Sequence, residues 1–441
     1  MPNTPRQLRK SLSGDALIRT LRDRFDTLAD TRVLPSISLT DALMSAFAVY
    51  ALKMPSLLAY EARRQEPKSN LYTVYHIAQA PCDSQLRDIL DPLAPECLRP
   101  CFSDICRQLQ RGKVLESFVF YQGHYLLSFD GTEHFCSEAI HCPHCLVKHH
   151  RDGRVTYHHQ LLTAVLAHPD HAEVIPLMPE PIRNSDGATK NDCERNAAKR
   201  LIAGFRRDHP QLQVIATGDG LTSNAPLIRT CRDYQIRFIL TAKPGDHTYL
   251  FANLEAAFRA GQTQVLTLWE AATQTLHHFR WLNRTPLNEA NVEVVVNLLE
   301  YWAIRDGAVM YANSWVTDLE ITTDSVWPIM RGGRTYWKIE NETHNTLKNQ
   351  GYQFEHNFGH GQQHLSVVFA LLMLLAFLVD QVQQLCCPLF QAAWRKAGSK
   401  RQLWEDLRSF FRTLVFTCLA EIWEAIARGL EKQKPVLLDD P

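Results

Sequence analysis

The spacing of apolar residues changes near residue 114 and separates a helical part of the chain from a part rich in predicted strands. In the helical part, Ser38-Leu-Thr-Asp41 can cap a helix. Residues 42–52 of that helix are apolar almost all round, which predicts that the helix is buried. Six prolines between residues 55 and 100 then divide the chain into short pieces.

Beyond residue 114, short apolar runs predict strands at residues 119–121, 125–129, 155–167, 173–178, 214–217 and 237–241. Helices are predicted between the last three strands: one capped by Asn191 or Asp192 with an apolar stripe through Phe205, and one at residues 225–234. Taking residues 119–129 as one strand, the order is β-β-β-α-β-α-β. Three antiparallel strands followed by βαβ units is the plan of an RNase H-like α/β mixed sheet, in which the ends of the first and fourth strands lie side by side.

The rest of the chain completes a five-part division. Residues 1–112 form a helical N-terminal region, 113–243 the first part of the core, and 244–312 a β-rich insertion. Residues 313–385 return to the core with a helix at 334–348, and residues 386–441 form a C-terminal helical region. The apolar run at 365–379 is shorter than the roughly 20 residues of a bilayer span, which favours a buried core helix.

Composition changes this picture little. The chain has 47 basic and 47 acidic residues, so any basic surface for nucleic acid must be local. Two basic clusters are candidates, and a solvated helix face is the alternative for each. The first contains Arg6, Arg9, Lys10, Arg19, Arg22 and Arg24, and the second contains Lys190, Arg195, Lys199, Arg200, Arg206 and Arg207.

The twelve cysteines bear on the cellular compartment. The N-terminus has no apolar segment typical of a secretory signal. Without such a signal, twelve cysteines predict reduced thiols in a cytoplasmic protein rather than a disulfide framework.

Three acidic segments carry the candidate chemistry. Asp130 and Asp219 each follow an apolar strand-like run and precede glycine, and Glu340 lies on the predicted helix 334–348. Either Asp-Gly pair alone is typical of an ordinary turn. Together, at adjacent strand ends, the acids predict a carboxylate cluster that binds two divalent cations for phosphoryl transfer. Because the ligands are all oxygen, we expect Mg²⁺, with Mn²⁺ able to substitute.

The same segments resemble those of a known family. The motifs Asp130-Gly-Thr132, Thr217-Gly-Asp-Gly-Leu221 and Trp337-Lys-Ile-Glu-Asn-Glu342, with Asn345-Thr-Leu-Lys-Asn-Gln-Gly-Tyr352 after them, are similar to motifs of DDE transposases of bacterial insertion sequences. The resemblance covers residues 38–385 and is to the cut-and-paste group with a β-rich insertion before the catalytic glutamate.

The resemblance implies a function. It implies that Asp130, Asp219 and Glu340 hold the metal ions and are catalytic. It also implies binding of terminal inverted repeats, DNA cleavage and strand transfer, a DNA-binding N-terminal region, and a homodimer that holds two element ends. A decayed or domesticated DNA-binding protein without catalysis, and a structure-selective nuclease on the same fold, are the alternatives.

The third motif departs from the family pattern. Tyr336 stands four residues before Glu340, where the family has arginine, and Lys348 stands eight residues after it. Glu342 is therefore the alternate third acid. We expect Tyr336 and Lys348 to contact DNA phosphates, together with Lys199 and Arg200 of the second basic cluster. The alternative is an amphipathic helix with solvated charges.

A second set of residues has the spacing of a metal site. Cys142 and Cys145 form a CxxC pair, and His149 follows four residues later. This spacing suits a structural Zn²⁺ with Cys136 as a fourth ligand. His150 can replace His149, and His141 or Cys193 can replace Cys136. A reduced, partly buried cysteine pair is the alternative.

Overall fold

The computed structural model describes residues 10–64, 70–184 and 193–429, and the chain forms two compact units. The strand-rich unit is Leu115–Asn345, and the helical unit combines Met1–Val114 with Thr346–Pro441. Arg6, Arg9 and Lys190 of the basic clusters, and the predicted caps Asn191 and Asp192, lie outside the described residues.

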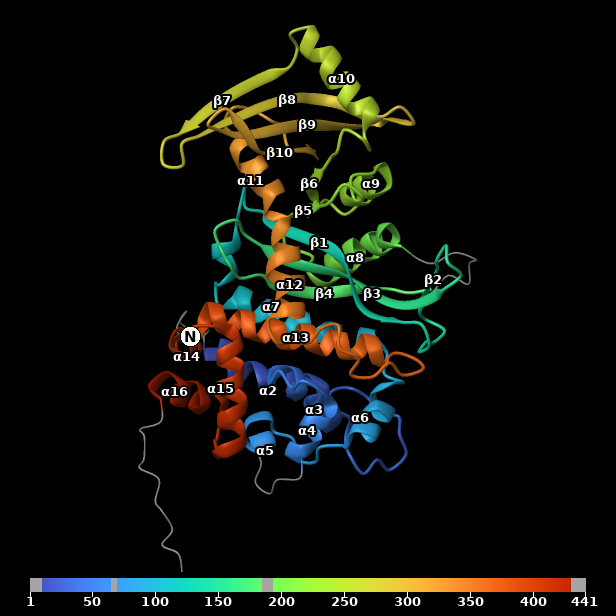
Figure 1. Cartoon of the computed structure of the whole chain (residues 1–441), viewed down its shortest axis with the longest axis vertical. Helices are drawn as coiled ribbons and strands as arrows, with labels where there is room; N and C mark the ends of the chain where they lie inside the picture. Colours follow the sequence, from blue (N-terminus) through green and yellow to red (C-terminus); the bar gives the residue numbers. More distant parts are fainter. Residues whose placement is uncertain (1–9, 65–69, 185–192, 430–441) are drawn as a thin grey trace, which may run out of the picture. The chain divides into compact units, whose positions relative to one another are not determined.

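Within the described residues, ten strands of the strand-rich unit form one sheet in the order β2-β3-β1-β5-β6-β10-β9-β8-β7, with β4 also paired to β3 (Figure 1). The strands are β1 (Tyr125–Ser137), β2 (Leu146–His149), β3 (Val155–Ala167), β4 (Ile175–Ile182), β5 (Val214–Gly218), β6 (Arg237–Thr241), β7 (Gln264–Glu270), β8 (Thr275–Asn288), β9 (Asn291–Arg305) and β10 (Ala308–Thr317). The protein is thus of the mixed α/β class, and most of its strand pairs are antiparallel.

Strand β1 is central to this sheet. It pairs antiparallel with β3 on one side and parallel with β5 on the other, where the register runs from Tyr125 opposite Val214 to Ser128 opposite Thr217. All five residues of β5 are buried, as expected for a parallel strand covered on both faces. The predicted adjacency of the first and fourth core strands is therefore present.

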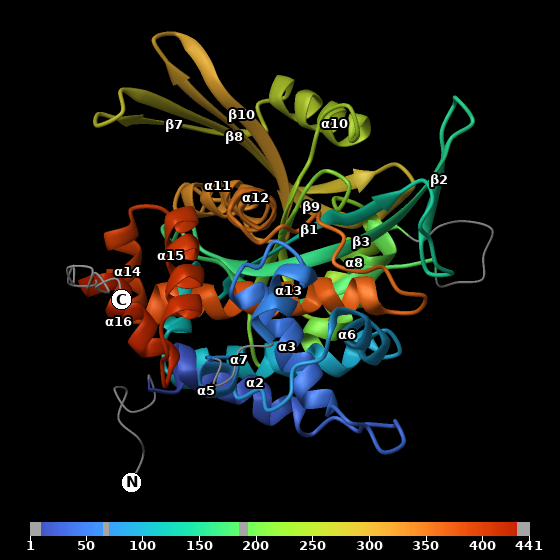
Figure 2. The same ribbon diagram turned by 60° about the horizontal axis from the view of Figure 1, so that its bottom comes forward.

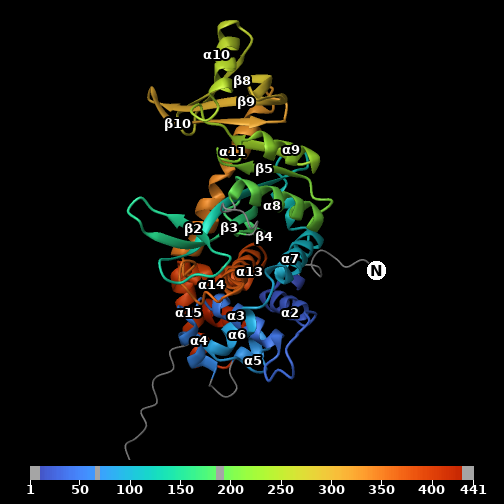
Figure 3. The same cartoon turned by 90° about the vertical axis from the view of Figure 1, so that its right-hand side faces the viewer.

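Helices cover this sheet. They are α8 (Glu194–Asp208), α9 (Ala225–Asp233), α10 (Thr248–Arg259) and α11 (Val326–Thr335), with short helical turns at η3 (Leu115–Phe118) and η4 (Ile339–His344). The boundary between the two units falls within α12 (Asn345–Asn349). The predicted apolar stripe of α8 is buried, and α8 and α9 lie next to each other along the sheet (Figure 3). The side chain of Asn224 caps α9 by accepting a hydrogen bond from the backbone N–H of Leu227.

Strands β7 to β10, which contain most of residues 244–312, extend the core sheet (Figure 2). Strand β10 pairs antiparallel with β6 on one side and with β9 on the other. One apolar cluster contains Ile215 and Ile239 of the core strands together with Phe279, Tyr301 and Trp315 of the extension. The β-rich segment is consequently bonded to the core by a continuous hydrogen-bond ladder and by shared packing.

Three predicted elements differ from the structure. Residues 119–121 form no named strand, because the chain makes the helical turn η3 and then an isolated bridge between Tyr121 and His124. Strand β1 does not end at Asp130 but continues to Ser137, since β3 pairs with it along its whole length. The predicted helix at 334–348 is split into α11, a π-helical turn at η4, and α12.

The described part of the helical unit consists of helices around one long apolar helix, α13 (Leu365–Cys386). The others are η1 (Lys10–Leu12), α2 (Gly14–Phe25), α3 (Leu39–Ala51), α4 (Leu57–Arg64), α5 (Asn70–Tyr75), α6 (Asp83–Leu90), η2 (Pro95–Leu98), α7 (Arg99–Arg111), α14 (Pro388–Ala397), α15 (Lys400–Thr413) and α16 (Leu419–Arg428). As predicted, Ser38 caps α3, which is buried along nearly its whole length. Helix α13 is long and apolar enough to cross a membrane, but its most apolar stretch is entirely buried, as in a core helix.

Candidate active site

Asp130 and Asp219 occupy equivalent positions on neighbouring parallel strands. The last residue pair of the β1–β5 ladder is Ser128 opposite Thr217, and each aspartate follows two residues later. The hydroxyls of Ser128 and Thr217 share a hydrogen bond of 2.7 Å, which fixes the two strands at this point. Because parallel neighbours lie about 4.8 Å apart and residues in register face the same side, the ladder brings the two aspartates together.

Asp219 is both an acid of this cluster and a turn residue. Its Oδ1 accepts hydrogen bonds from the backbone N–H groups of Leu221 (3.0 Å) and Thr222 (3.2 Å). This is the hydrogen-bond pattern of an Asx turn. Asp219 can therefore be both a turn residue and an acid of the cluster. The turn engages Oδ1 and holds the carboxylate at the end of β5.

Three further side chains surround Asp130. The Tyr336 hydroxyl donates a hydrogen bond to the Asp130 carboxylate, and His344 Nδ1 lies 3.7 Å from Asp130 Oδ2. His344 Nε2 and Thr163 Oγ1 share a hydrogen bond of 2.7 Å, and Thr163 Oγ1 also donates to the Asp130 carbonyl oxygen. The Tyr336 hydroxyl is thus engaged with an acid, and a contact of Tyr336 with a DNA phosphate stays a prediction. The sequence analysis did not select His344, although it lies four residues after Glu340.

The electrostatics of Asp130 fit a divalent cation. Burial raises the pKa of Asp130 to about 6, the hydrogen bond from Tyr336 opposes this rise, and the negative charges of Asp219 and Glu340 add to it. Burial is also the largest cause that raises the pKa of Tyr336, followed by the charge of Asp130 and its hydrogen bond, and then by the charges of Asp219 and Glu194. A hard divalent cation would relieve the repulsion between these carboxylates, and its preferred ligands are oxygens of this kind.

Glu340 and Glu342 face different partners. The negative charge of Glu340 raises the pKa of Asp130. The charge of Glu342 acts instead on Lys338. Burial lowers the pKa of Lys338, and Glu342 partly opposes this fall. Both glutamates lie in a π-helical turn, in which the backbone N–H of Asn345 bonds to the carbonyl oxygen of Glu340, five residues earlier. Among the described residues, the oxygens of Asp130, Asp219 and Glu340 do not all lie within 4.8 Å of one another, so these side chains would have to move closer together to share one ion.

A fourth carboxylate, Glu194, approaches the cluster and was not selected from the sequence. It lies in the first turn of α8, and a Cβ atom placed on Gly131 would be 2.1 Å from its Oε1. Burial raises the pKa of Glu194, and the charges of Asp130 and Asp219 raise it further. Since Gly131 has no side chain, Glu194 reaches the cluster through the space that a larger residue would fill.

The predicted DNA contacts on α8 are only partly exposed to solvent. Arg200 donates to Glu180 (2.7 Å) and to the carbonyl oxygen of Pro181. Arg206 donates to backbone carbonyls that include those of Tyr234 and Leu212, so it stabilises the loops around α8. Lys199 is half-buried on the same helix. DNA bound at α8 would therefore have to compete with Glu180 and the Pro181 carbonyl oxygen for Arg200.

The N-terminal basic cluster is likewise partly engaged. Arg22 pairs with Asp41 (3.2 Å), and Arg24 pairs with Asp104 (2.6 Å). Lys10 and Arg19 are exposed. The described part of this cluster therefore offers fewer solvent-facing charges than the sequence predicted.

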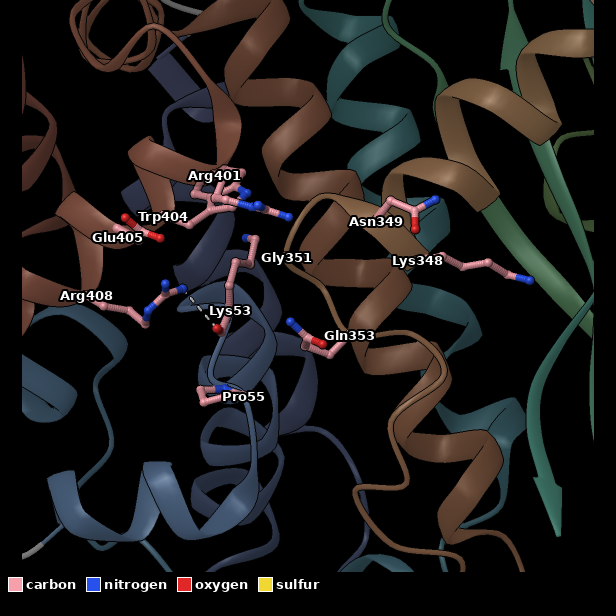
Figure 4. Close-up of a pocket in the computed structure, with 10 residues that line it drawn as sticks. All are labelled: Lys53, Pro55, Lys348, Asn349, Gly351, Gln353, Arg401, Trp404, Glu405 and Arg408. Atoms are coloured by element: carbon pink, nitrogen blue, oxygen red, sulfur yellow. Dashed lines mark hydrogen bonds between the residues drawn. The ribbon is translucent and has the colours of Figure 1, made fainter.

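Lys348 belongs to the helical unit and lines a cavity of about 500 Å³ there (Figure 4). Its Nζ lies 2.8 Å from Glu355 Oε1. Arg408 donates a hydrogen bond to the Lys53 carbonyl oxygen, drawn as a dashed line in Figure 4. The Lys53 ammonium is buried 4.2 Å from the centre of the Trp404 ring. The cavity is basic, but three of its cationic side chains already have partners.

The predicted zinc ligands separate into two groups. Cys142 and Cys145 are buried and lie together, beside His159 of β3. Cys136 is exposed near the end of β1, opposite His158, and His149 is exposed at the end of β2. The structure does not bring Cys136 or His149 to the cysteine pair.

Comparison with known proteins adds little to this geometry. No protein-family model matches the chain, and no curated protein matches it. A cryo-EM structure of a piggyBac transposase synaptic complex with hairpin DNA is similar, with 12% sequence identity and a TM-score of 0.40 over 99% of this chain and 88% of that one. A similarity of this extent assigns no function, so a functional proposal depends on the residues themselves.

Proposed function

We propose that this protein is a DDE transposase of the bacterial insertion-sequence type, with an RNase H-like core and the catalytic acids Asp130, Asp219 and Glu340. The observation that carries the proposal is the in-register position of Asp130 and Asp219 beyond the last β1–β5 pair, with Glu340 close enough to raise the pKa of Asp130. The strand order β4-β3-β1-β5-β6 supports the RNase H-like assignment.

The proposed reaction begins with hydrolysis at the end of the element. A water oxygen forms a bond to phosphorus, the bond from phosphorus to the 3′ oxygen breaks, and the leaving oxygen takes up a proton. The oxygen of the freed 3′-hydroxyl then forms a bond to a phosphorus of the target DNA and gives up its proton. The bond from that phosphorus to the 3′ oxygen of the target strand breaks, and this leaving oxygen takes up a proton. Mg²⁺ bound by the three carboxylates, with Mn²⁺ as a substitute, would stabilise negative charge on the phosphorus and on the leaving oxygen.

The neighbouring side chains have positioning roles in this proposal. The Tyr336 hydroxyl favours the ionised form of Asp130, which is the form that binds a cation. Thr163 holds the backbone of β1 at Asp130 and also bonds His344. The Asx turn orients Asp219 from the adjacent strand. Each aspartate is thereby fixed by contacts within the strand-rich unit.

The substrate of this reaction would be double-stranded DNA in the bacterial cytoplasm. A homodimer is proposed because two element ends must be held together for excision. The exposed Lys10 and Arg19, and Lys199 on α8, are the basic side chains of the described clusters that we propose for DNA contact.

The test is excision of a marked element from a plasmid that carries the element's own two ends, with Mg²⁺ or Mn²⁺ present. We expect excision by the intact protein and none by Asp219→Asn, a variant that keeps the side-chain shape. Asp306→Asn, which changes an exposed acid in the turn between β9 and β10, serves as the matched control and should excise normally.

The outcomes separate the alternatives. Cleavage by the intact protein without joined products would favour a structure-selective nuclease on the same fold. Binding of the ends without cleavage, by the intact protein and the variant alike, would favour a DNA-binding protein that has lost catalysis.

A further inference from the structure

Two cysteines and one histidine form a buried triangle away from the acid cluster. The Sγ atoms of Cys142 and Cys145 are 3.8 Å apart, and His159 Nε2 lies 3.5 Å from the first and 3.4 Å from the second. All three residues are buried, with exposed fractions of 7%, 1% and 2%. A nitrogen and two sulfurs therefore converge on one point inside the strand-rich unit.

The sides of this triangle match those of a tetrahedral zinc site. Zinc binds cysteine sulfur at about 2.3 Å and histidine nitrogen at about 2.0–2.1 Å. In a tetrahedron those bond lengths separate two sulfurs by about 3.8 Å and a sulfur from a nitrogen by about 3.5 to 3.6 Å. The distances also exclude a disulfide, in which the sulfurs are about 2.05 Å apart.

The local backbone holds the cysteine pair in this arrangement. The N–H of Cys145 bonds to the carbonyl oxygen of Cys142 (3.2 Å), which closes a tight turn just before β2. The backbone N–H of Cys142 points at Cys145 Sγ at 3.4 Å. The turn therefore holds the two sulfur atoms close together.

Strand alternation explains why His159 belongs to the triangle and Cys136 does not. Successive side chains of β3 point to opposite faces of the sheet. His158 and its register partner Cys136 therefore share one face, while His159 faces the other. His149 pairs beside Val155, four residues before His159, which places it about 13 Å along the strand at 3.3 Å per residue.

We propose that Cys142, Cys145 and His159 hold a zinc ion at three of its four tetrahedral positions, and that this ion fixes the turn before β2 against β3. Thiolate and imidazole donors in tetrahedral geometry are typical of zinc. The site holds the segment between β1 and β3, the two strands on which Asp130 and its neighbour Thr163 lie. This inference is independent of the proposed transposase activity, since its ligands are not the carboxylates of the acid cluster.

The first experiment measures metal in the purified full-length protein. We expect one zinc ion per chain by elemental analysis, and X-ray absorption should report two sulfur ligands at about 2.3 Å. Replacement of zinc by Co²⁺ should give the intense visible bands of a tetrahedral thiolate site. Protein without zinc that also fails to give this cobalt spectrum, or protein that holds iron instead, would overturn the assignment.

Adjacent histidines supply the matched variants. His159→Gln should lower zinc affinity by at least tenfold, measured by competition with a chromophoric chelator, whereas His158→Gln on the opposite face should not. Cys142→Ser should lose the metal, and Cys136→Ser should keep it. Equal loss in the two histidine variants would contradict the ligand set. If Cys142→Ser does not fold, the cobalt spectrum of the intact protein still decides the question.

Discussion

The carboxylate of Glu194 occupies the space that a side chain at Gly131 would need. A Cβ at residue 131 would lie 2.1 Å from Glu194 Oε1, and its nearest contacts are all with that side chain. Because the obstacle is the far end of a flexible side chain, Gly131→Ala should move Glu194 away from the acid cluster while the chain still folds.

This relationship predicts a non-additive effect on metal affinity. Glu194→Gln should weaken Mn²⁺ binding by about 10- to 100-fold, the range for a residue that supports metal ligands. Gly131→Ala should weaken it in the same direction, and the double variant should lose little more than Glu194→Gln alone. Titration calorimetry measures all three affinities. Gly245→Ala is the control, since nothing lies near its Cβ position. Additive losses would show that Gly131 acts independently of Glu194.

The two glutamates of the π-helical turn should behave differently. Glu340 acts electrostatically on Asp130 and Glu342 acts on Lys338. We therefore expect Glu340→Gln to lower the cleavage rate by more than about 100-fold, the upper range for residues outside the first coordination sphere. Glu342→Gln should stay within a few-fold of the intact protein. Strand cleavage of labelled element ends measures both rates, and a larger loss for Glu342→Gln would reverse the assignment.

The raised pKa of Asp130 makes the stability of the metal-free protein depend on pH. Its pKa is about 6 in the folded chain against an ordinary value of 3.8. Between these values the folded chain holds a proton that the unfolded chain has released, so the free energy of unfolding falls as pH rises from about 4 to 6. The fall amounts to at most about 3 kcal/mol.

Denaturant unfolding at pH 4 and pH 7 checks this dependence. Asp130→Asn removes the titrating group, so its stability relative to the intact protein should increase with pH. Mg²⁺ at pH 7 should stabilise the intact protein more than the variant. Identical pH profiles for the two proteins would show that Asp130 does not titrate in this range.

Removing one partner of a buried ion pair should strongly destabilise the helical unit. Lys53 Nζ lies 2.5 Å from Asp380 Oδ2, the Tyr352 hydroxyl donates to the same oxygen at 2.6 Å, and the Lys53 side chain has no solvent exposure. Asp380→Ala would leave a buried ammonium unpaired and should cost about 3–5 kcal/mol of unfolding free energy. Chemical denaturation measures this cost. Glu138→Gln, which breaks an exposed pair with Arg154, is the control and should change stability by less than about 1 kcal/mol.

Apolar runs were sufficient to predict much of the strand-rich unit. Predicted strands at residues 155–167 and 237–241 are β3 and β6, and each contains a short, mainly apolar run that is buried. The closeness of Asp130 and Asp219 was predicted from the order of the strands alone. The roles proposed for these acids remain predictions.

Other features depend on contacts that no local pattern contains. Glu194 is an ordinary first-turn acid until Gly131 leaves room for it. His159 joins the cysteine pair only through the register of β3, and CxxC spacing pointed instead to His149. The π-helical turn moves Glu340 off the period of an α-helix, so the predicted spacing from Tyr336 did not describe its position.

The continuous ladder from β7 to β1 has a mechanical consequence. Strands β10, β9, β8 and β7 are joined to β6 edge to edge, and β6 is joined through β5 to the strand that carries Asp130. A hinge between the extension and the acids would have to break backbone hydrogen bonds in the middle of a sheet. Any change in the twist of β7 to β10 would therefore have to reach the acid cluster through the hydrogen bonds of the sheet rather than through a flexible joint.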